Sequence, residues 1–205
     1  MCEAGYYCPA GTKRVSEFAC PSGTYNSNYG STSSSVCTTC PSGYFCPKGS
    51  ASPTPCFPGF LCTDTGLKSM IPCPGGTYQN QKQQTICTTC PQGAFCPTAS
   101  VYPQLCPPGT YNDFTGIEFI TQCKACPNNH LCSIFGLSSY SDGTQPIAEP
   151  GYLSPLNSKY GQELPCPPGT YDTTTGTLTS PSSCTACPAG VSCREGTSTS
   201  GVIRT

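Results

Sequence analysis

The hydrophobic residues of this chain stand in short groups beside cysteines, without the period of a helix or of a long strand. Four times the sequence reads C-P-x-G-T-Y, beginning at Cys20, Cys73, Cys106 and Cys166. Threonine and tyrosine favour strands, and proline and glycine favour turns. Each motif therefore predicts a type I turn, with cysteine first, proline second and glycine fourth, that leads into a short strand. We expect short β-hairpins and almost no helix.

The aromatic residues of these motifs are expected to cover adjacent disulfides and to form small cores, because an aromatic ring buries a large apolar area. Each tyrosine of a C-P-x-G-T-Y motif has this expected role, and so does a phenylalanine before a later cysteine of two repeats. They are Tyr25, Tyr78, Tyr111, Tyr171, Phe45 and Phe95. Together they would replace a conventional core.

The C-P-x-G-T-Y motif opens a larger repeat, which continues into C-x2-C and then C-x5-C. The last two spacings never vary, which predicts fixed geometry, whereas the first loop varies in length. We divide the chain into a partial repeat at 1–19, repeat 1 at 20–55, a half repeat at 56–72, repeat 2 at 73–105, repeat 3 at 106–132, an insertion loop at 133–165 and repeat 4 at 166–205.

The composition indicates the cellular compartment of the protein. The chain has 20 cysteines in 205 residues, a density that predicts a disulfide scaffold and hence an extracellular, lumenal or cell-surface location. With 22 glycines, 23 prolines and no tryptophan, small cross-linked modules are expected in place of one large core. The net charge of -1, without a basic cluster, argues against nucleic acid and anionic membrane surfaces as partners. No apolar run reaches the length of a membrane span.

Two pairing schemes fit the cysteines. If each C-x5-C loop closes on itself, no thiol is left over, and this local scheme is favoured. It pairs Cys2 with Cys8, Cys20 with Cys37, Cys40 with Cys46, Cys56 with Cys62, Cys73 with Cys87, Cys90 with Cys96, Cys106 with Cys123, Cys126 with Cys132, Cys166 with Cys184 and Cys187 with Cys193. The alternative is an interleaved scheme that bridges the gaps between successive repeats.

The pattern C-P-x-G-T-Y followed by C-x2-C-P-x-G-x-x-C resembles the ephrin-receptor-like cysteine-rich repeat, which is distantly similar to tumour-necrosis-factor-receptor and EGF-like modules. The resemblance covers nearly the whole chain apart from about 133–165. It implies an elongated, disulfide-stapled array in surface, matrix or filament proteins, including mastigoneme-like proteins. It implies no enzyme activity, no cofactor and no catalytic residue.

Other chemistry has weak signals. The C-x2-C pairs are spaced like zinc half-sites or redox dithiols. A zinc site needs thiolates in a reducing compartment, and a thioredoxin-like dithiol needs a βαβ context, which this chain rich in glycine and proline lacks. His130 is the only histidine, and we interpret it as a surface variation of its loop. Asp64 and Asp142 are isolated acidic residues without an EF-hand pattern. We therefore expect no catalytic site, no cofactor and no metal site.

Glycans are a possible modification of the loops. The chain has no N-x-[ST] sequon, but serine and threonine cluster at 31–35, 173–175 and 197–200. These clusters are candidate O-glycan sites in a glycoprotein, and the alternative is that they are simply polar loops.

The segment 133–165 departs from the repeat and is rich in apolar residues. Its length and content predict that it packs on its own array or docks on a neighbouring molecule. The residues proposed for an assembly contact are Ile134, Phe135, Leu137, Tyr140, Tyr152, Leu153, Leu156 and Tyr160.

We expect a structural repeat segment of a secreted or cell-surface protein that assembles into an extracellular filament or coat, by self-association or with other extracellular structural proteins. The alternative is the ectodomain of a receptor or adhesin that binds a ligand. The chain starts without a signal peptide although its cysteines indicate secretion, so we expect it to be a fragment of a longer protein.

Overall fold

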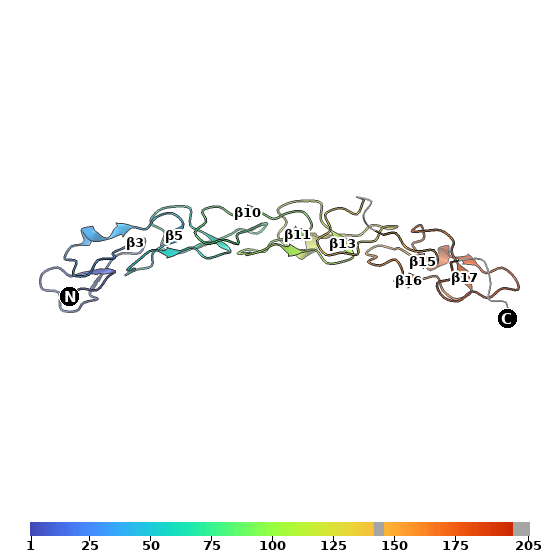
Figure 1. The fold of residues 1–205 in the computed structure, drawn as a ribbon, viewed down its shortest axis with the longest axis horizontal. Helices are drawn as coiled ribbons and strands as arrows, with labels where there is room; N and C mark the ends of the chain where they lie inside the picture. The colour runs from blue at the N-terminus through green and yellow to red at the C-terminus, as the bar shows by residue number, and fades with distance from the viewer. Residues whose placement is uncertain (142–145, 199–205) are drawn as a thin grey trace. The chain divides into compact units, whose positions relative to one another are not determined.

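The computed structural model describes residues 1–141 and 146–198. These residues form nine separate two-stranded antiparallel sheets, each a small hairpin (Figure 1). The hairpins are β1 (Tyr6–Tyr7) with β2 (Phe18–Ala19), β3 (Thr24–Tyr25) with β4 (Thr38–Thr39), β5 (Tyr44–Phe45) with β6 (Thr54–Pro55), β7 (Phe60–Leu61) with β8 (Ile71–Pro72), β9 (Thr77–Tyr78) with β10 (Thr88–Thr89), β11 (Ala94–Phe95) with β12 (Gln104–Leu105), β13 (Thr110–Tyr111) with β14 (Lys124–Ala125), β15 (Tyr152–Leu153) with β16 (Leu164–Pro165), and β17 (Thr170–Tyr171) with β18 (Thr185–Ala186).

Helix is confined, in the described residues, to three short 3-10 turns at η1 (Ser34–Val36), η2 (Ile120–Gln122) and η3 (Pro181–Ser183). The expected fold class, a tandem array of small disulfide-rich hairpins with almost no helix, is confirmed. The chain divides into two compact units, one formed by Met1–Cys90 with Cys96–Pro103, and the other by Pro91–Phe95 with the chain from Gln104 onward.

The first strand of each repeat follows a turn that differs from the expected one. In repeat 1 the turn is closed by a hydrogen bond from the Thr24 N–H to the Pro21 carbonyl, at 3.0 Å. Proline is thus first in the turn, and Gly23 is third with a φ of 90°. A positive φ at the third position is type II geometry, so the prediction of a type I turn was wrong. The Thr24 hydroxyl also donates to the Pro21 carbonyl, at 2.8 Å, which explains the threonine of the motif.

Successive hairpins within each unit are joined through these turn glycines. The Gly23 N–H donates to the Cys46 carbonyl at 2.7 Å, while the Gly23 carbonyl accepts from the Cys40 N–H at 2.9 Å. In the second unit, Gly109 makes the same two bonds with Cys132 and Cys126, at 2.8 and 2.9 Å. Each turn is therefore held by the hairpin that follows it, which is a non-local contact that the local motif does not reveal.

The ten disulfides follow the local scheme throughout. Cys20 is bonded to Cys37 and Cys40 to Cys46, and the other pairs follow the same rule, so no cysteine is free. The interleaved scheme does not occur. Most of these cysteines are fully buried, and they make up most of the buried apolar residues. The disulfides are thus the core of the fold.

Aromatic and aliphatic side chains extend this core in small clusters. Phe95 packs with Cys106 and Ile117. Tyr111 packs against Cys126 and Cys132, as expected of a ring that covers a disulfide. The equivalent rings of the other three repeats, Tyr25, Tyr78 and Tyr171, are half-buried.

The segment 133–165 is not simply an insertion loop, because it contains the hairpin β15–β16. The sequence A-E-P-G-Y-L-S at 148–154 shares the Pro-Gly pair and the aromatic-leucine pair of C-F-P-G-F-L-C at 56–62. Ala148 and Ser154 stand where that segment has its two cysteines. Both replacements are fully buried, as the cysteines are elsewhere. A search based on cysteines misses this hairpin, whereas the retained Pro-Gly turn and Tyr-Leu strand would have found it.

Candidate functional site

The residues proposed for an assembly contact divide into an exposed and a packed group. Four are exposed, with relative accessibilities of 52% for Ile134, 63% for Phe135, 57% for Leu156 and 55% for Tyr160. We call these four residues the exposed apolar set. The other four are Leu137, Tyr140, Tyr152 and Leu153. The structure shows these four residues packed against their own array, which was the alternative to an assembly contact.

Leu137 and Tyr140 belong to the core cluster of Cys126 and Cys132. Leu137 is 3% exposed, and its carbonyl accepts a hydrogen bond from the Asn112 N–H at 2.9 Å. The Tyr140 ring meets the Tyr111 ring edge to face, with 4.9 Å between centroids. These two residues therefore stabilise the join between neighbouring hairpins.

His130 also contacts this cluster. Its ring lies edge to face against Tyr140, with 4.8 Å between centroids, and the residue is half-buried. It is thus more than the surface variation that the sequence indicated, since it packs against an aromatic residue.

Tyr152 and Leu153 form the strand β15 and pack inward. Leu153 is 4% exposed. The Tyr152 hydroxyl lies over Gly196, 3.0 Å from the position that a Cβ would take there. A side chain at 196 would therefore collide with the tyrosine, and the pair is part of the packing between β15–β16 and the hairpin that follows.

The exposed apolar set comes from two segments that lie side by side. The Cys132 N–H donates to the Ser158 carbonyl at 3.1 Å, which holds the chain before Ile134 against the chain between Leu156 and Tyr160. Exposed apolar side chains also occur elsewhere, and examples are Tyr29, Ile86, Tyr102, Phe114 and Phe119.

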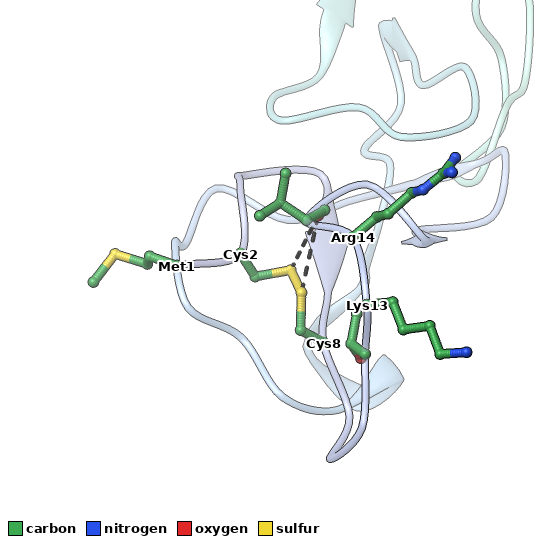
Figure 2. Close-up of a pocket in the computed structure, with 7 residues that line it drawn as sticks. Met1, Cys2, Cys8, Lys13 and Arg14 are labelled. Carbon is green, nitrogen blue, oxygen red and sulfur yellow. Dashed lines mark hydrogen bonds between the residues drawn. A yellow bond between two sulfur atoms is a disulfide. The ribbon is translucent and has the colours of Figure 1, made fainter.

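A small cavity of 260 Å³ lies beside the first disulfide (Figure 2). It is lined by Met1, Cys2, Cys8, Thr12, Lys13, Arg14 and Val15. The backbone N–H groups of Lys13 and Arg14 donate to the Glu17 carboxylate, at 2.9 and 3.3 Å. Both cysteines are in a disulfide, so neither supplies a thiolate nucleophile. The residues that line the cavity include no histidine and no carboxylate.

The metal and redox interpretations of C-x2-C are also excluded by the pairing. Cys37 and Cys40 are bonded to different partners, so they are neither a dithiol nor a pair of thiolate ligands. Across residues 1–141 and 146–198, no three acidic, cysteine or histidine side chains are grouped as a metal site requires. Asp64 is exposed and accepts a hydrogen bond from Thr63 at 3.0 Å, and Asp142 lies outside the described residues.

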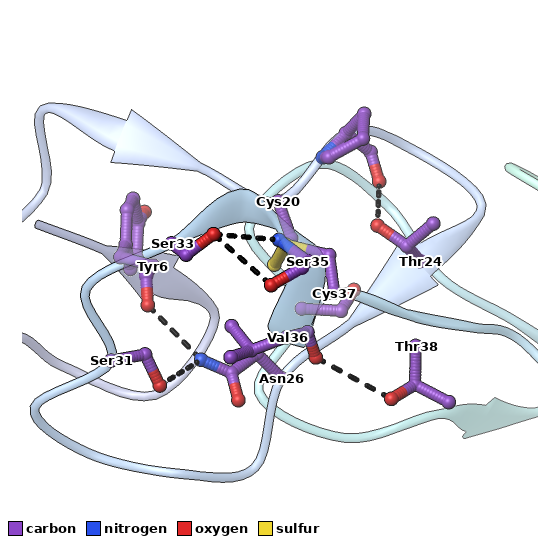
Figure 3. Close-up of a disulfide and its surroundings, with 12 residues drawn as sticks. Tyr6, Cys20, Thr24, Asn26, Ser31, Ser33, Ser35, Val36, Cys37 and Thr38 are labelled. Atoms are coloured by element: carbon purple, nitrogen blue, oxygen red, sulfur yellow. Dashed lines mark hydrogen bonds between the residues drawn. A yellow bond between two sulfur atoms is a disulfide. The ribbon is translucent and has the colours of Figure 1, made fainter. Parts of the chain in front are cut away.

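The candidate glycan clusters are partly structural. At 31–35, Ser31 is buried and its hydroxyl accepts from the Asn26 amide at 3.0 Å, while the Ser33 hydroxyl caps η1 (Figure 3). At 173–175, the Thr174 hydroxyl is bonded to Asp172. In the cluster at 197–200, the Thr197 hydroxyl donates to a carbonyl at 2.6 Å, and 199–200 lie outside the described residues. The exposed hydroxyl residues at 32, 34 and 35, at 173 and 175, and at 198 stay candidates for O-glycans.

One surface ion pair is well formed. The Lys124 ammonium lies 2.7 Å from the Asp113 carboxylate and 4.1 Å from the centre of the Phe114 ring. The hydrogen bond from Lys124 lowers the pKa of Asp113. Both side chains are exposed, so the pair orders the loop more than it stabilises the fold.

No helix in the described residues is long and apolar enough to cross a membrane. The disulfides fit a secreted or extracellular protein. The chain matches no protein-family model and no curated protein.

Proposed function

We propose that this chain is a structural repeat segment of a secreted or cell-surface protein that assembles into an extracellular filament or coat. The observation that carries the proposal is the exposed apolar set, four exposed apolar side chains on two segments that the hydrogen bond between Cys132 and Ser158 joins. A group of this kind on a sparingly charged protein fits a contact with another molecule.

The construction of the hairpins supports a structural role. Among the nine hairpins of the described residues, disulfides bridge four and enclose the first strand of four more, and backbone hydrogen bonds join hairpins that follow one another. Such an array tolerates loop variation without loss of its backbone, as extracellular repeat proteins require. The resemblance to ephrin-receptor-like repeats points in the same direction, since that family implies surface, matrix and filament proteins. The partner in this proposal is a second copy of the chain or another extracellular structural protein.

The first test is electron microscopy of the protein isolated natively from its source. Filaments or sheets with a regular repeat are the expected result. Separate particles would contradict the proposal and favour the receptor or adhesin alternative, for which a ligand would then be sought.

A second test locates the contact. The variant Ile134→Ser/Phe135→Ser should lower self-association in sedimentation velocity at least about tenfold, the effect of losing one or two buried apolar side chains. The matched control is Ile86→Ser/Tyr102→Ser, which removes two exposed apolar side chains, 72% and 65% accessible, from other loops. An equal loss of self-association in both variants would show nonspecific hydrophobic association instead of a defined contact.

A further inference from the structure

The hairpin β15–β16 is built like the others but lacks their covalent closure. In four of the other eight hairpins, the first strand lies inside a C-x5-C disulfide loop. In the remaining four, a disulfide joins the cysteine four residues before the first strand to the cysteine directly before the second strand. Before and after β15, Ala148 and Ser154 stand at the positions of the two cysteines. No disulfide therefore encloses the first strand of this hairpin or bridges its two strands.

The same substitution produces the longest stretch of chain without a cross-link. Between Cys132 and Cys166 there are 33 residues, against nine to eleven between the bonded cysteines that bound the equivalent gaps, such as Cys46 to Cys56. Under a pulling force, the disulfides elsewhere limit the chain that one gap can release to nine to eleven residues, whereas here the stretch between bonded cysteines has 33 residues.

The hairpin is held by noncovalent contacts with both neighbours. The following hairpin accepts a hydrogen bond from the Ser154 N–H at the Leu178 carbonyl, at 2.8 Å, and the preceding one accepts from the Asn157 N–H at the Cys126 carbonyl, at 2.9 Å. Within the hairpin, the Cys166 N–H donates to the Gly151 carbonyl at 2.7 Å. Ala148 and Leu153 are buried beneath these bonds. Such contacts are sufficient to order the hairpin, but they break one after another under load and re-form when the load is removed.

We propose that residues 148–165 form a yielding hairpin, the element that opens first and recloses when the chain is stretched while the disulfide-bonded hairpins keep their structure. No covalent bond changes in this step. The property belongs to the single chain and holds whether or not the chain assembles, so it does not rest on the proposed function.

Hydrogen exchange on the full chain tests the local stability directly. Amides of 148–165 should exchange roughly 30-fold faster than those of the bonded counterpart at 56–72, the factor expected from closing a seven-residue loop. The variant Ala148→Cys/Ser154→Cys should remove most of the difference, and Ser154→Ala, which adds no cross-link, should not. Equal protection of the two hairpins in the unmodified chain would overturn the proposal.

Single-molecule stretching tests the mechanical claim. The first extension at the lowest force should release at most about 120 Å, the extended length between Cys132 and Cys166, whereas the other gaps would release about 40 Å or less. Glu163 stands three residues before Cys166, as Cys123 stands before Cys126, so Ala148→Cys/Glu163→Cys copies the longer type of disulfide. This bond should shorten the first extension by about 45 Å.

An unchanged first extension in that variant, with the new bond confirmed by mass spectrometry, would show that another element yields first. The unmodified chain gives an independent test, because a first extension of only about 40 Å would also contradict the proposal.

Discussion

The hairpins β7–β8 and β15–β16 have the same turn and strand pattern but differ in covalent closure. In both, a Pro-Gly turn leads into an aromatic residue and a leucine, and in both the turn glycine has a strongly positive φ, 84° at Gly59 and 87° at Gly151. Cys56 and Cys62 are bonded around the first strand, whereas Ala148 and Ser154 leave the second without a bond. The comparison teaches that the turn, the strand and the contacts with the next hairpin specify this shape, and that the disulfide stabilises it.

Full reduction followed by alkylation should have the largest effect on stability, because it leaves every hairpin without a disulfide, as β15–β16 already is. In the chain-entropy model, each C-x5-C loop loses about 2 kcal/mol and each longer loop about 3 kcal/mol, and ten such losses exceed the usual stability of a domain. We expect circular dichroism and amide protection to show an unfolded chain. A spectrum that stays the same would mean that the noncovalent contacts suffice everywhere.

The turn glycines offer the next test, since both hairpins depend on them. A Cβ at Gly59 would lie 2.5 Å from the Ala99 carbonyl oxygen, and one at Gly151 would lie 2.4 Å from that of Gly196. Gly59→Ala and Gly151→Ala should each cost roughly 3 kcal/mol, from the positive φ and the collision together. Amide exchange should show 148–165 open in the second variant and 56–72 still folded in the first, because its disulfide remains.

Gly169→Ala is the matched control for these glycine variants. Gly169 has a φ of 85°, but no atom of residues 1–141 or 146–198 lies within 4 Å of the position of its Cβ. It should therefore lose only about 1 to 2 kcal/mol, the cost of the backbone conformation. A loss as large as that of Gly151→Ala would mean that the contact with the next hairpin contributes nothing.

Removing one disulfide converts one hairpin into the other. Cys56→Ala/Cys62→Ser gives β7–β8 the residues of β15–β16 at both positions and should cost about 2 kcal/mol in the free energy of unfolding measured with urea. The hairpin should persist, with faster amide exchange confined to 56–72. Misfolding of the whole first unit would show that the turn and strand do not specify the hairpin without the bond.

The sequence predicted what local spacing determines. The Thr-Tyr strands and the lack of helix followed from the motif, and the local pairing was the favoured one of two schemes because it left no thiol over. The turn type did not, because Gly23 is placed by a hydrogen bond to Cys46 in the next hairpin, which the motif does not contain. For the same reason Leu137 and Leu153 were expected at a contact but are buried within the array.

A substitution at Asp172 should give the smallest change in stability. Its side chain lies at the contact between β15–β16 and the next hairpin. At the equivalent position, the Asn112 side-chain oxygen accepts from the Phe114 N–H at 3.0 Å, and its amide nitrogen donates to the carbonyls of Ala94 and Phe114 at 3.2 and 2.8 Å. The Asp172 Oδ1 makes the corresponding bond with Thr174, but in the described structure its buried Oδ2 has no partner.

Asp172→Asn supplies a donor where the carboxylate has none, and so should stabilise the chain by about 1 kcal/mol and slow exchange in 148–165. The reverse variant, Asn112→Asp, should destabilise by about 1 to 3 kcal/mol, because two bonds to carbonyls are lost in a buried site. Urea titration of both variants measures the two changes. If Asp172→Asn lowered the stability, the side chain at 172 would not occupy the role of Asn112, and the yielding hairpin would owe its weakness to the missing disulfide alone.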